Sequence, residues 1–239
     1  LVLIITGFKL CATTARQATT LAYYQVKWSK QSLSAQLTLR EKKAVVCGYD
    51  QPTVQAIQAH LNASAITSTL LQNNDFSSIS QATLADYFII ALAPVDDDSF
   101  ALTALDEQLQ QTFFMVQALT QKLLSLKSSQ PLQIIVLSTK PSVYTRALVG
   151  FAKSLHQEQS QLSCRIIEVQ DIQVLAKELS QTEVHVRYNK YQQRFASYYQ
   201  PLTPTPTAVS LLQQGGVYLI TGGLGGLGYL FAAYLAEYY

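Results

Sequence analysis

Apolar and polar residues alternate in blocks along most of the chain. Short apolar runs, each about the length of a strand, are separated by longer segments in which apolar residues recur every three or four positions. Such alternation of strands and helices is typical of a parallel sheet that is covered on both faces. The predicted strands are 23–28, 44–47, 65–71, 87–93, 132–137, 164–169 and 183–188, the last paired with 194–198. The predicted helices are 50–60, a long helix with its apolar stripe over 102–123, 144–157 and 172–179.

A second unit begins after a segment rich in proline and threonine. Residues 201–214 are predicted to form a semi-rigid linker. A strand at 217–220, a glycine-rich loop and a helix follow. We therefore predict an α/β chain in which a doubly wound, Rossmann-like parallel sheet at 23–200 is followed by the first strand–helix unit of a second Rossmann fold at 215–239. Residues 1–22 have the pattern of a strand and linker belonging to a preceding domain.

Composition narrows the class of protein. Apolar residues make up 49% of the 239 residues and charged residues 13%, which excludes intrinsic disorder. The net charge of +2 comes from scattered side chains, which argues against nucleic-acid binding. No apolar run is long enough to span a bilayer. The three cysteines lie far apart, without the spacing of a zinc site or a disulfide framework, and indicate a reducing cytoplasm. The chain starts and ends within predicted elements, so we expect it to be a fragment of a longer protein.

The glycine-rich loop carries the clearest chemistry. Glycines let the backbone N–H groups approach a pyrophosphate closely, and the N-terminus of the following helix adds free donors and positive charge. The spacing fits Thr-Gly-x-x-x-Gly-x-Gly better than Gly-x-Gly-x-x-Gly, and the alternative is a merely flexible turn. The candidate cofactor-binding residues are Thr221, Gly222, Gly223, Leu224, Gly225, Gly226, Leu227 and Gly228.

This spacing resembles that of the short-chain dehydrogenase/reductase superfamily. The stretch from Gly215 to Gly228 resembles the start of the catalytic subdomain of ketoreductase domains in modular type I polyketide synthases. Residues 23–28, 150–158, 165–169 and 183–188 resemble the structural subdomain of those enzymes, a truncated Rossmann-like fold without cofactor. Residues 1–10 resemble the last strand of an upstream dehydratase domain.

The resemblance implies a function for the intact domain. It would use NADPH to reduce a β-ketoacyl group attached through phosphopantetheine to an acyl carrier protein, beside neighbouring synthase domains. The catalytic Ser, Tyr and Lys of the family follow the glycine loop at a distance that this chain does not reach. We therefore assign no catalytic residue and expect the chain alone to be an inactive scaffold half. The alternatives are a non-enzymatic module from a reductase-inactive domain and a reductase similar to that of fatty acid synthase.

The first strand-to-helix turn differs from the glycine loop. Residues 47–52 contain one glycine, Gly48, and place Asp50 and Pro52 where a phosphate would need backbone donors and no negative charge. We expect no dinucleotide there.

Other candidate sites are better explained as structure. Tyr23 and Lys27 have catalytic spacing but lie on a predicted strand. Ser138, Tyr144 and Leu148 lie where a reductase would place Ser, Tyr and Lys, so leucine replaces the lysine and the set is interpreted as a vestige of duplication. We interpret Trp28 as a packing anchor of its strand. The isolated residues His60, His156 and His185 are assigned to helix surfaces or the sheet, and Asp96, Asp97 and Asp98 to a helix N-terminus.

Overall fold

The computed structural model describes residues 23–33, 41–93, 102–202 and 212–239, with only the backbone of residues 102–104. The expectations for residues 1–22, for the three aspartates at 96–98 and for most of the linker concern residues outside these ranges. The chain divides into a compact unit, Val26–Gln200, and a second unit that contains Pro201–Tyr239 and the residues up to Gln25. Each unit is described by itself.

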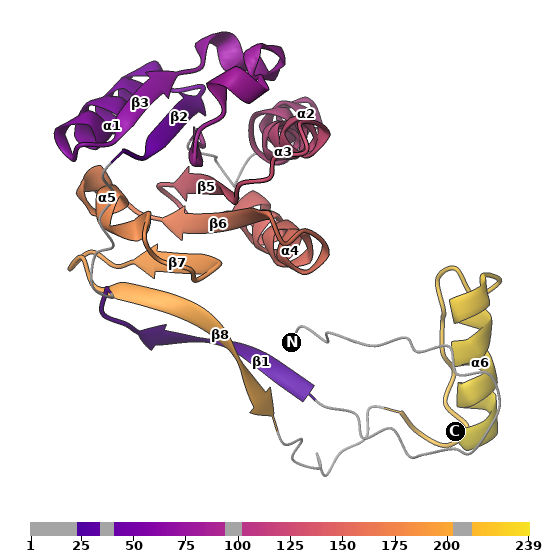
Figure 1. The fold of residues 1–239 in the computed structure, drawn as a ribbon. Coiled ribbons are helices and arrows are strands. Elements are labelled where there is room, and N and C mark those ends of the chain that lie inside the picture. Colours follow the sequence, from indigo (N-terminus) through magenta and orange to yellow (C-terminus); the bar gives the residue numbers. More distant parts are fainter. Residues whose placement is uncertain (1–22, 34–40, 94–101, 203–211) are drawn as a thin grey trace. The chain divides into compact units, whose positions relative to one another are not determined.

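The larger unit is built on one sheet with the strand order β1-β8-β7-β6-β5-β4-β2-β3 (Figure 1). Neighbouring strands from β3 to β7 run parallel, as predicted, and β8 pairs with β7 in the antiparallel direction. The Rossmann-like fold class is confirmed. The strands are β1 (Tyr23–Lys30), β2 (Lys43–Gly48), β3 (Thr67–Leu70), β4 (Tyr87–Ala91), β5 (Leu132–Ser138), β6 (Leu162–Glu168), β7 (His185–Tyr188) and β8 (Arg194–Leu202).

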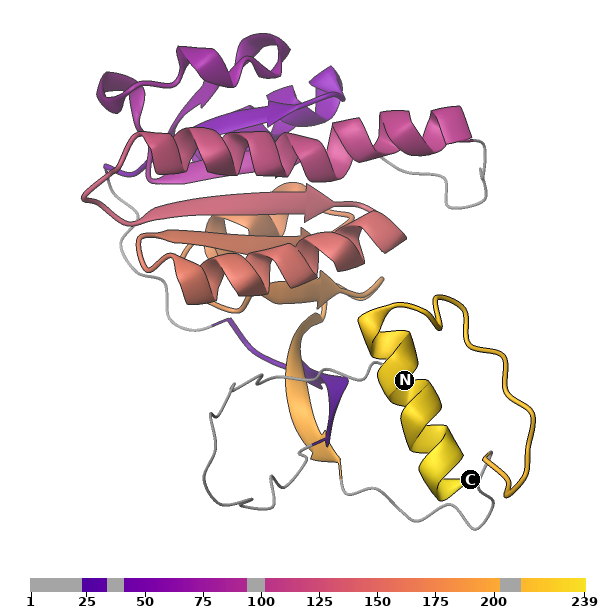
Figure 2. The same cartoon turned by 90° about the vertical axis from the view of Figure 1, so that its right-hand side faces the viewer.

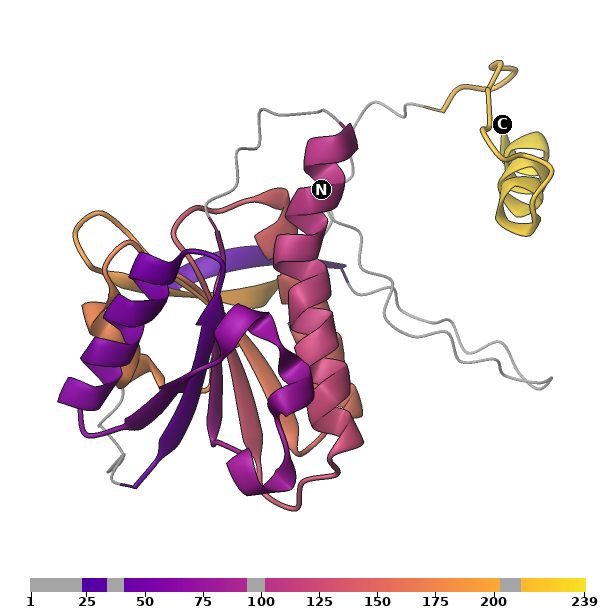
Figure 3. The same cartoon turned by 90° about the horizontal axis from the view of Figure 1, so that it is seen from above.

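Helices cover both faces of this sheet (Figures 1 and 3). One face packs against α1 and α5, and the other packs against α3 and α4, which lie side by side in Figure 2. The strands are therefore buried on both faces, which explains why their sequences are apolar runs rather than alternating patterns. The helices are α1 (Gln51–Ala63), α2 (Leu102–Leu109), α3 (Met115–Ser125), α4 (Val143–Glu158) and α5 (Leu175–Glu178).

Two connections depart from the predicted pattern. The long helix predicted over 102–123 is interrupted by a π-helical turn at Gln110–Phe114, in which the buried Thr112 hydroxyl donates to the Gln108 carbonyl oxygen at 2.5 Å. The connection from β3 to β4 contains no α-helix but three short 3₁₀ turns. These turns are Gln72–Asn74, Phe76–Ser78 and Gln81–Thr83. The larger unit therefore lacks one helix of a complete doubly wound fold.

Helix α4 offers a test of local helix propensity. Gly150 lies on its exposed face, and a Cβ atom added there would meet no atom within 4 Å. We expect Gly150→Ala to stabilise the unit by roughly 0.5–1 kcal/mol, because alanine loses less backbone entropy than glycine in a helix. Urea denaturation followed by circular dichroism measures the change. A loss of stability would show that this backbone position is approached by another group.

The second unit corrects one prediction. Residues 217–220 are extended but form no strand, whereas α6 (Gly226–Tyr238) is formed as predicted. A strand requires a hydrogen-bonded neighbour, and no strand described in the chain pairs with this segment. The exposed fractions of Val217 and Leu219 are 100% and 94%, and α6 has no buried residue. In the described parts of the chain, no helix is both long and apolar enough to cross a membrane.

Candidate cofactor-binding site

The glycine loop is a compact pair of turns directly before α6. The Gly223 N–H donates to the Ile220 carbonyl oxygen at 3.2 Å, and the Gly225 N–H donates to the Gly222 carbonyl oxygen at 2.9 Å. Gly222 has a φ of +70°, a left-handed backbone conformation that residues other than glycine adopt only with strain. The loop thus needs a glycine at its second position, as the Thr-Gly-x-x-x-Gly-x-Gly spacing requires.

Gly228 is required for a different reason. It lies in the first turn of α6, where the helix crosses the start of the loop. A Cβ atom on Gly228 would lie 2.6 Å from the Gly223 Cα and would also overlap the Gly222 carbonyl oxygen. A Cβ atom on Gly226 would meet no atom within 4 Å. The two glycines therefore differ: Gly228 permits close packing of loop and helix, whereas Gly226 borders open space.

The N-terminus of α6 has N–H groups without intrahelical acceptors. The first intrahelical bond runs from the Tyr229 N–H to the Gly225 carbonyl oxygen at 2.9 Å. The N–H groups of Gly226, Leu227 and Gly228 precede it and have no intrahelical acceptor. The N-cap residue, Gly225, has no side chain that could bond to them. Such a helix end favours a phosphate or another anion.

The electrostatic setting is compatible with an anion. Among residues 212–239 the only charged side chain is Glu237, near the opposite end of α6. The side chains of Leu224 and Leu227 are exposed, with fractions of 105% and 70%. The loop therefore offers backbone donors, the helix dipole and two apolar side chains.

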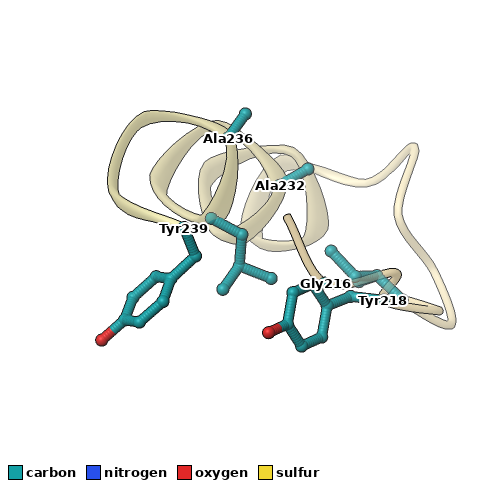
Figure 4. Close-up of a pocket in the computed structure, with 7 residues that line it drawn as sticks. Gly216, Tyr218, Ala232, Ala236 and Tyr239 are labelled. Atoms are coloured by element: carbon teal, nitrogen blue, oxygen red, sulfur yellow. The ribbon is translucent and has the colours of Figure 1, made fainter. Parts of the chain in front are cut away.

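A hollow in the same unit is separate from this loop (Figure 4). It has a volume of about 240 Å³ and lies between the extended segment 216–220 and α6. Tyr218 closes one end of it, with its hydroxyl donating to the Gln213 carbonyl oxygen at 3.0 Å. No loop residue from Thr221 to Gly228 lines the hollow. Its lining residues are Gly216, Tyr218, Ile220, Ala232, Leu235, Ala236 and Tyr239.

The corresponding turn of the larger unit is filled by protein atoms. The Gly48 N–H, at the end of β2, donates to the Asn74 side-chain oxygen at 3.0 Å. A Cβ atom on Gly48 would lie 2.6 Å from the Ala91 carbonyl oxygen and 2.9 Å from a Val54 methyl group. The Asp50 carboxylate accepts a hydrogen bond from the Thr53 hydroxyl. The glycine here serves packing between β2, β4 and α1, and its N–H is already bonded.

Ser138 on β5 and Tyr144 and Leu148 on α4, the set interpreted as a vestige of duplication, also have structural roles. The Ser138 hydroxyl donates to the Lys140 carbonyl oxygen at 2.6 Å, and the buried Tyr144 hydroxyl donates to the Gln108 side chain at 2.8 Å. Leu148 is 0% exposed in the core. Ser138 and Tyr144 thus each have their own partner outside the set.

Two buried charge clusters escaped sequence reasoning. Glu178 is 0% exposed and accepts hydrogen bonds from Arg165, Arg194 and Tyr188 at 2.6 Å each. Burial alone would raise the pKa of Glu178, but these donors hold it below its ordinary range. The polar groups of this cluster are partnered from within the fold, so removing one of them would leave the others buried without a partner.

The second cluster surrounds Glu168. This carboxylate accepts from His185 at 2.9 Å and from Arg187 at 2.6 Å, and these bonds hold its pKa low against the effect of burial. Among the described residues, no group of three or more His, Cys, Asp or Glu side chains could hold a metal ion. The indole of Trp28 packs on His185 and Arg187, in agreement with its interpretation as an anchor.

Comparison with known proteins supports the family resemblance. Polyketide synthase PksM of Bacillus subtilis (strain 168) is 46% identical over 66 residues, which are 28% of this chain and 2% of that protein. An N-terminal ketoreductase from the macrolactin assembly line matches in structure with a TM-score of 0.64 and 20% identity, over 89% of this chain and 51% of the other. A C2-type ketoreductase from a modular polyketide synthase matches with a TM-score of 0.57 and 15% identity, over 89% of this chain and 50% of the other. The chain thus spans about half of these ketoreductases.

A family model for the beta-ketoacyl synthase-like N-terminal region also matches, over residues 73–185. These residues cover less than half of the chain and form part of the parallel sheet. Their one cysteine, Cys164, is buried in β6, and burial raises the pKa of its thiol to about 12. A thiolate that accepts an acyl group must be accessible and ionised. The only cysteine in the matched residues is therefore not such a thiolate.

The likeness expected from the glycine loop is thus confirmed. The chain has the fold of polyketide synthase ketoreductase domains, and 66 of its residues are similar in sequence to part of a polyketide synthase.

Proposed function

We propose that this chain is part of an NADPH-dependent ketoreductase of a cytoplasmic polyketide synthase. Residues 23–200 form the structural subdomain, residues 201–214 link it to the catalytic subdomain, and residues 215–239 begin that subdomain. Residues 1–22 belong to the preceding domain and linker. The observation that carries the proposal is the loop from Thr221 to Gly228, in which Gly222 and Gly228 are required by geometry and three N–H groups at the start of α6 have no intrahelical acceptor.

The residues present fit the pyrophosphate of NADPH. The N–H groups of Gly226, Leu227 and Gly228 would hold its oxygens, and the α6 dipole would favour its charge. When bound, the nicotinamide supplies a hydride for reducing a ketone. The substrate is a β-ketoacyl group on the phosphopantetheine of an acyl carrier protein. In the family a Ser, a Tyr and a Lys assist this reaction, and we assign none of these roles to a residue of this chain.

The larger unit is the scaffold in this proposal. Its own switch-point turn has its glycine N–H bonded to Asn74 and a carboxylate, Asp50, beside it. A bound anion would have to break the hydrogen bond between the Gly48 N–H and Asn74, and it would be repelled by the Asp50 carboxylate. This contrast between the two turns supports a division into a cofactor-free and a cofactor-binding part.

Titration of the ¹⁵N-labelled chain with inorganic pyrophosphate tests the loop. We expect weak, millimolar binding whose chemical-shift changes are confined to the amides of residues 222–229. Gly48 serves as the internal comparison, and its amide is expected not to move. We also expect no turnover of a β-keto thioester with NADPH by this chain. Shift changes at Gly48, or none at the loop, would contradict the proposed site, and measurable turnover would contradict the scaffold role.

Substitution of Gly228 provides the matched variant. Gly228→Ala is expected to abolish the pyrophosphate-induced shifts, because the new methyl group overlaps the backbone of Gly222 and Gly223 and must displace the helix from the loop. The same titration measures it, and Gly150→Ala, where the new methyl group meets no atom within 4 Å, is the control. Retained binding by Gly228→Ala would show that the crossing of helix and loop does not form the anion site.

A further inference from the structure

The β1–β8 ribbon extends beyond the sheet that supports it. Strand β8 has nine residues, yet its pairing with β7 involves only Arg194, Phe195 and Ala196. On its other side β8 has β1 as its strand neighbour, and Figure 1 shows the two strands leaving the sheet together. An isolated two-stranded ribbon is marginally stable in water. Contacts other than strand pairing must therefore hold it.

One set of contacts fixes β1. The Trp28 ring lies 4.7 Å from the His185 ring, edge to face, and the Arg187 guanidinium lies 4.4 Å from the Trp28 centroid. Both β7 side chains are bonded to the buried carboxylate of Glu168. The indole therefore packs on side chains that are themselves held in place.

A second set fixes the base of the ribbon. The Gln31 N–H, just after β1, donates to the Arg194 carbonyl oxygen at 3.1 Å. The Arg194 guanidinium bonds to Glu178 at 2.6 Å, to Glu183 at 2.7 Å and to the Gln31 side chain at 3.3 Å. Arg194 thus joins the buried charge cluster to both strands.

A third contact lies further out. The Lys153 ammonium group, on α4, donates to the Tyr199 hydroxyl at 2.9 Å and lies 4.1 Å from the centroid of the same ring. Tyr199 is three residues beyond the last β8 residue that pairs with β7. It is followed by Gln200, the last residue of the larger unit.

We propose that the ribbon is a rigid strut, clamped to the larger unit by Trp28, Arg194 and Lys153, which determines where the chain leaves the sheet. The clamps come from three different elements and reach to within one residue of the end of the unit. Protection of the backbone is then expected to extend along β8 to Gln200 and not to stop where β8 leaves β7. This inference does not depend on the proposed reductase function.

Hydrogen exchange of the full chain, followed by mass spectrometry, tests the strut. In the native chain the amides of 197–200 are expected to exchange far more slowly than those of 212–216. Lys153→Gln is expected to speed exchange at 197–200 by about tenfold, because it removes a cation–π contact and a charged donor together. Exchange in β5 should not change. Lys153→Arg, which keeps the cation, should retain most of the protection.

Lys122→Gln is the matched control, since Lys122 bonds to the Ser77 carbonyl oxygen on the same face of the sheet but does not touch the ribbon. Fast exchange at 197–200 in the native chain would overturn the strut. If Lys153→Gln leaves the exchange rates at 197–200 unchanged, Lys153 does not hold the ribbon. That result would contradict the proposal that the ribbon is rigid as far as Tyr199.

Discussion

Glu178→Gln is expected to destabilise the larger unit by about 3–5 kcal/mol. The substitution leaves Arg165, which is 1% exposed, without a carboxylate partner, and leaves Arg194, which is 4% exposed, with only the partly exposed Glu183. Removing one partner of a buried ion pair costs this much because the other charges stay desolvated. Urea denaturation monitored by circular dichroism gives the change in the free energy of unfolding.

Glu158→Gln is the matched control, because Glu158 is exposed at the end of α4. We expect a change within about 0.5 kcal/mol for it. Replacing Arg165, Glu178 and Arg194 together by apolar residues should cost less than Glu178→Gln alone. A loss below about 1 kcal/mol for Glu178→Gln would mean that water reaches the cluster.

The same carboxylate sets a dependence of stability on pH. The folded-state pKa of Glu178 is lowered from its ordinary value of 4.5. Its contribution to stability is therefore complete above that value and is lost as the pH falls through the lower, folded-state pKa. Glu168 is shifted in the same direction, so both clusters weaken in the same acidic range.

Leu148→Lys should unfold the chain rather than create a reductase. The substitution restores the residue type that the vestigial set lacks, but Leu148 is 0% exposed in the core between α4 and the sheet. A buried, unpaired ammonium group is costly enough that we expect a loss on the order of 4 kcal/mol or more. The chain's unfolding free energy and its turnover of a β-keto thioester are the measurements.

Leu148→Met separates charge from shape. It keeps a similar volume and should cost less than about 1.5 kcal/mol. A stable Leu148→Lys protein with measurable turnover would show that Ser138 and Tyr144 form a working site, in conflict with their separate hydrogen-bond partners.

Sequence patterns predicted the strands that are buried on both faces of the sheet. The strands β4 and β5 are apolar runs because both faces are buried, and that signal is local. The π-helical turn escaped prediction because it depends on where the Thr112 hydroxyl bonds. The strand predicted at 217–220 requires a neighbour, which is information that a single segment does not carry.

The glycine loop could be predicted because its contacts join residues that are close in the sequence, whereas the buried charge clusters join residues that are further apart. Gly222 and Gly228 are needed by contacts within eight residues, so their spacing alone indicated the turn. Glu178 and Arg165 are thirteen residues apart on different elements, and in the sequence each has the appearance of an ordinary surface charge. Only the packing of α5 on the sheet brings them together.

The anchor of β1 has a spectroscopic consequence. Trp28 is the only tryptophan of the chain, and its indole touches a histidine and an arginine of β7. Intrinsic tryptophan fluorescence therefore reports the state of the ribbon and carries no tryptophan signal from residues 201–239. An unfolding curve recorded by fluorescence can precede one recorded by circular dichroism simply because the ribbon detaches first. If the fluorescence and circular dichroism curves of this protein do not coincide, local release of β1 is the first explanation to test. A folding intermediate is the second.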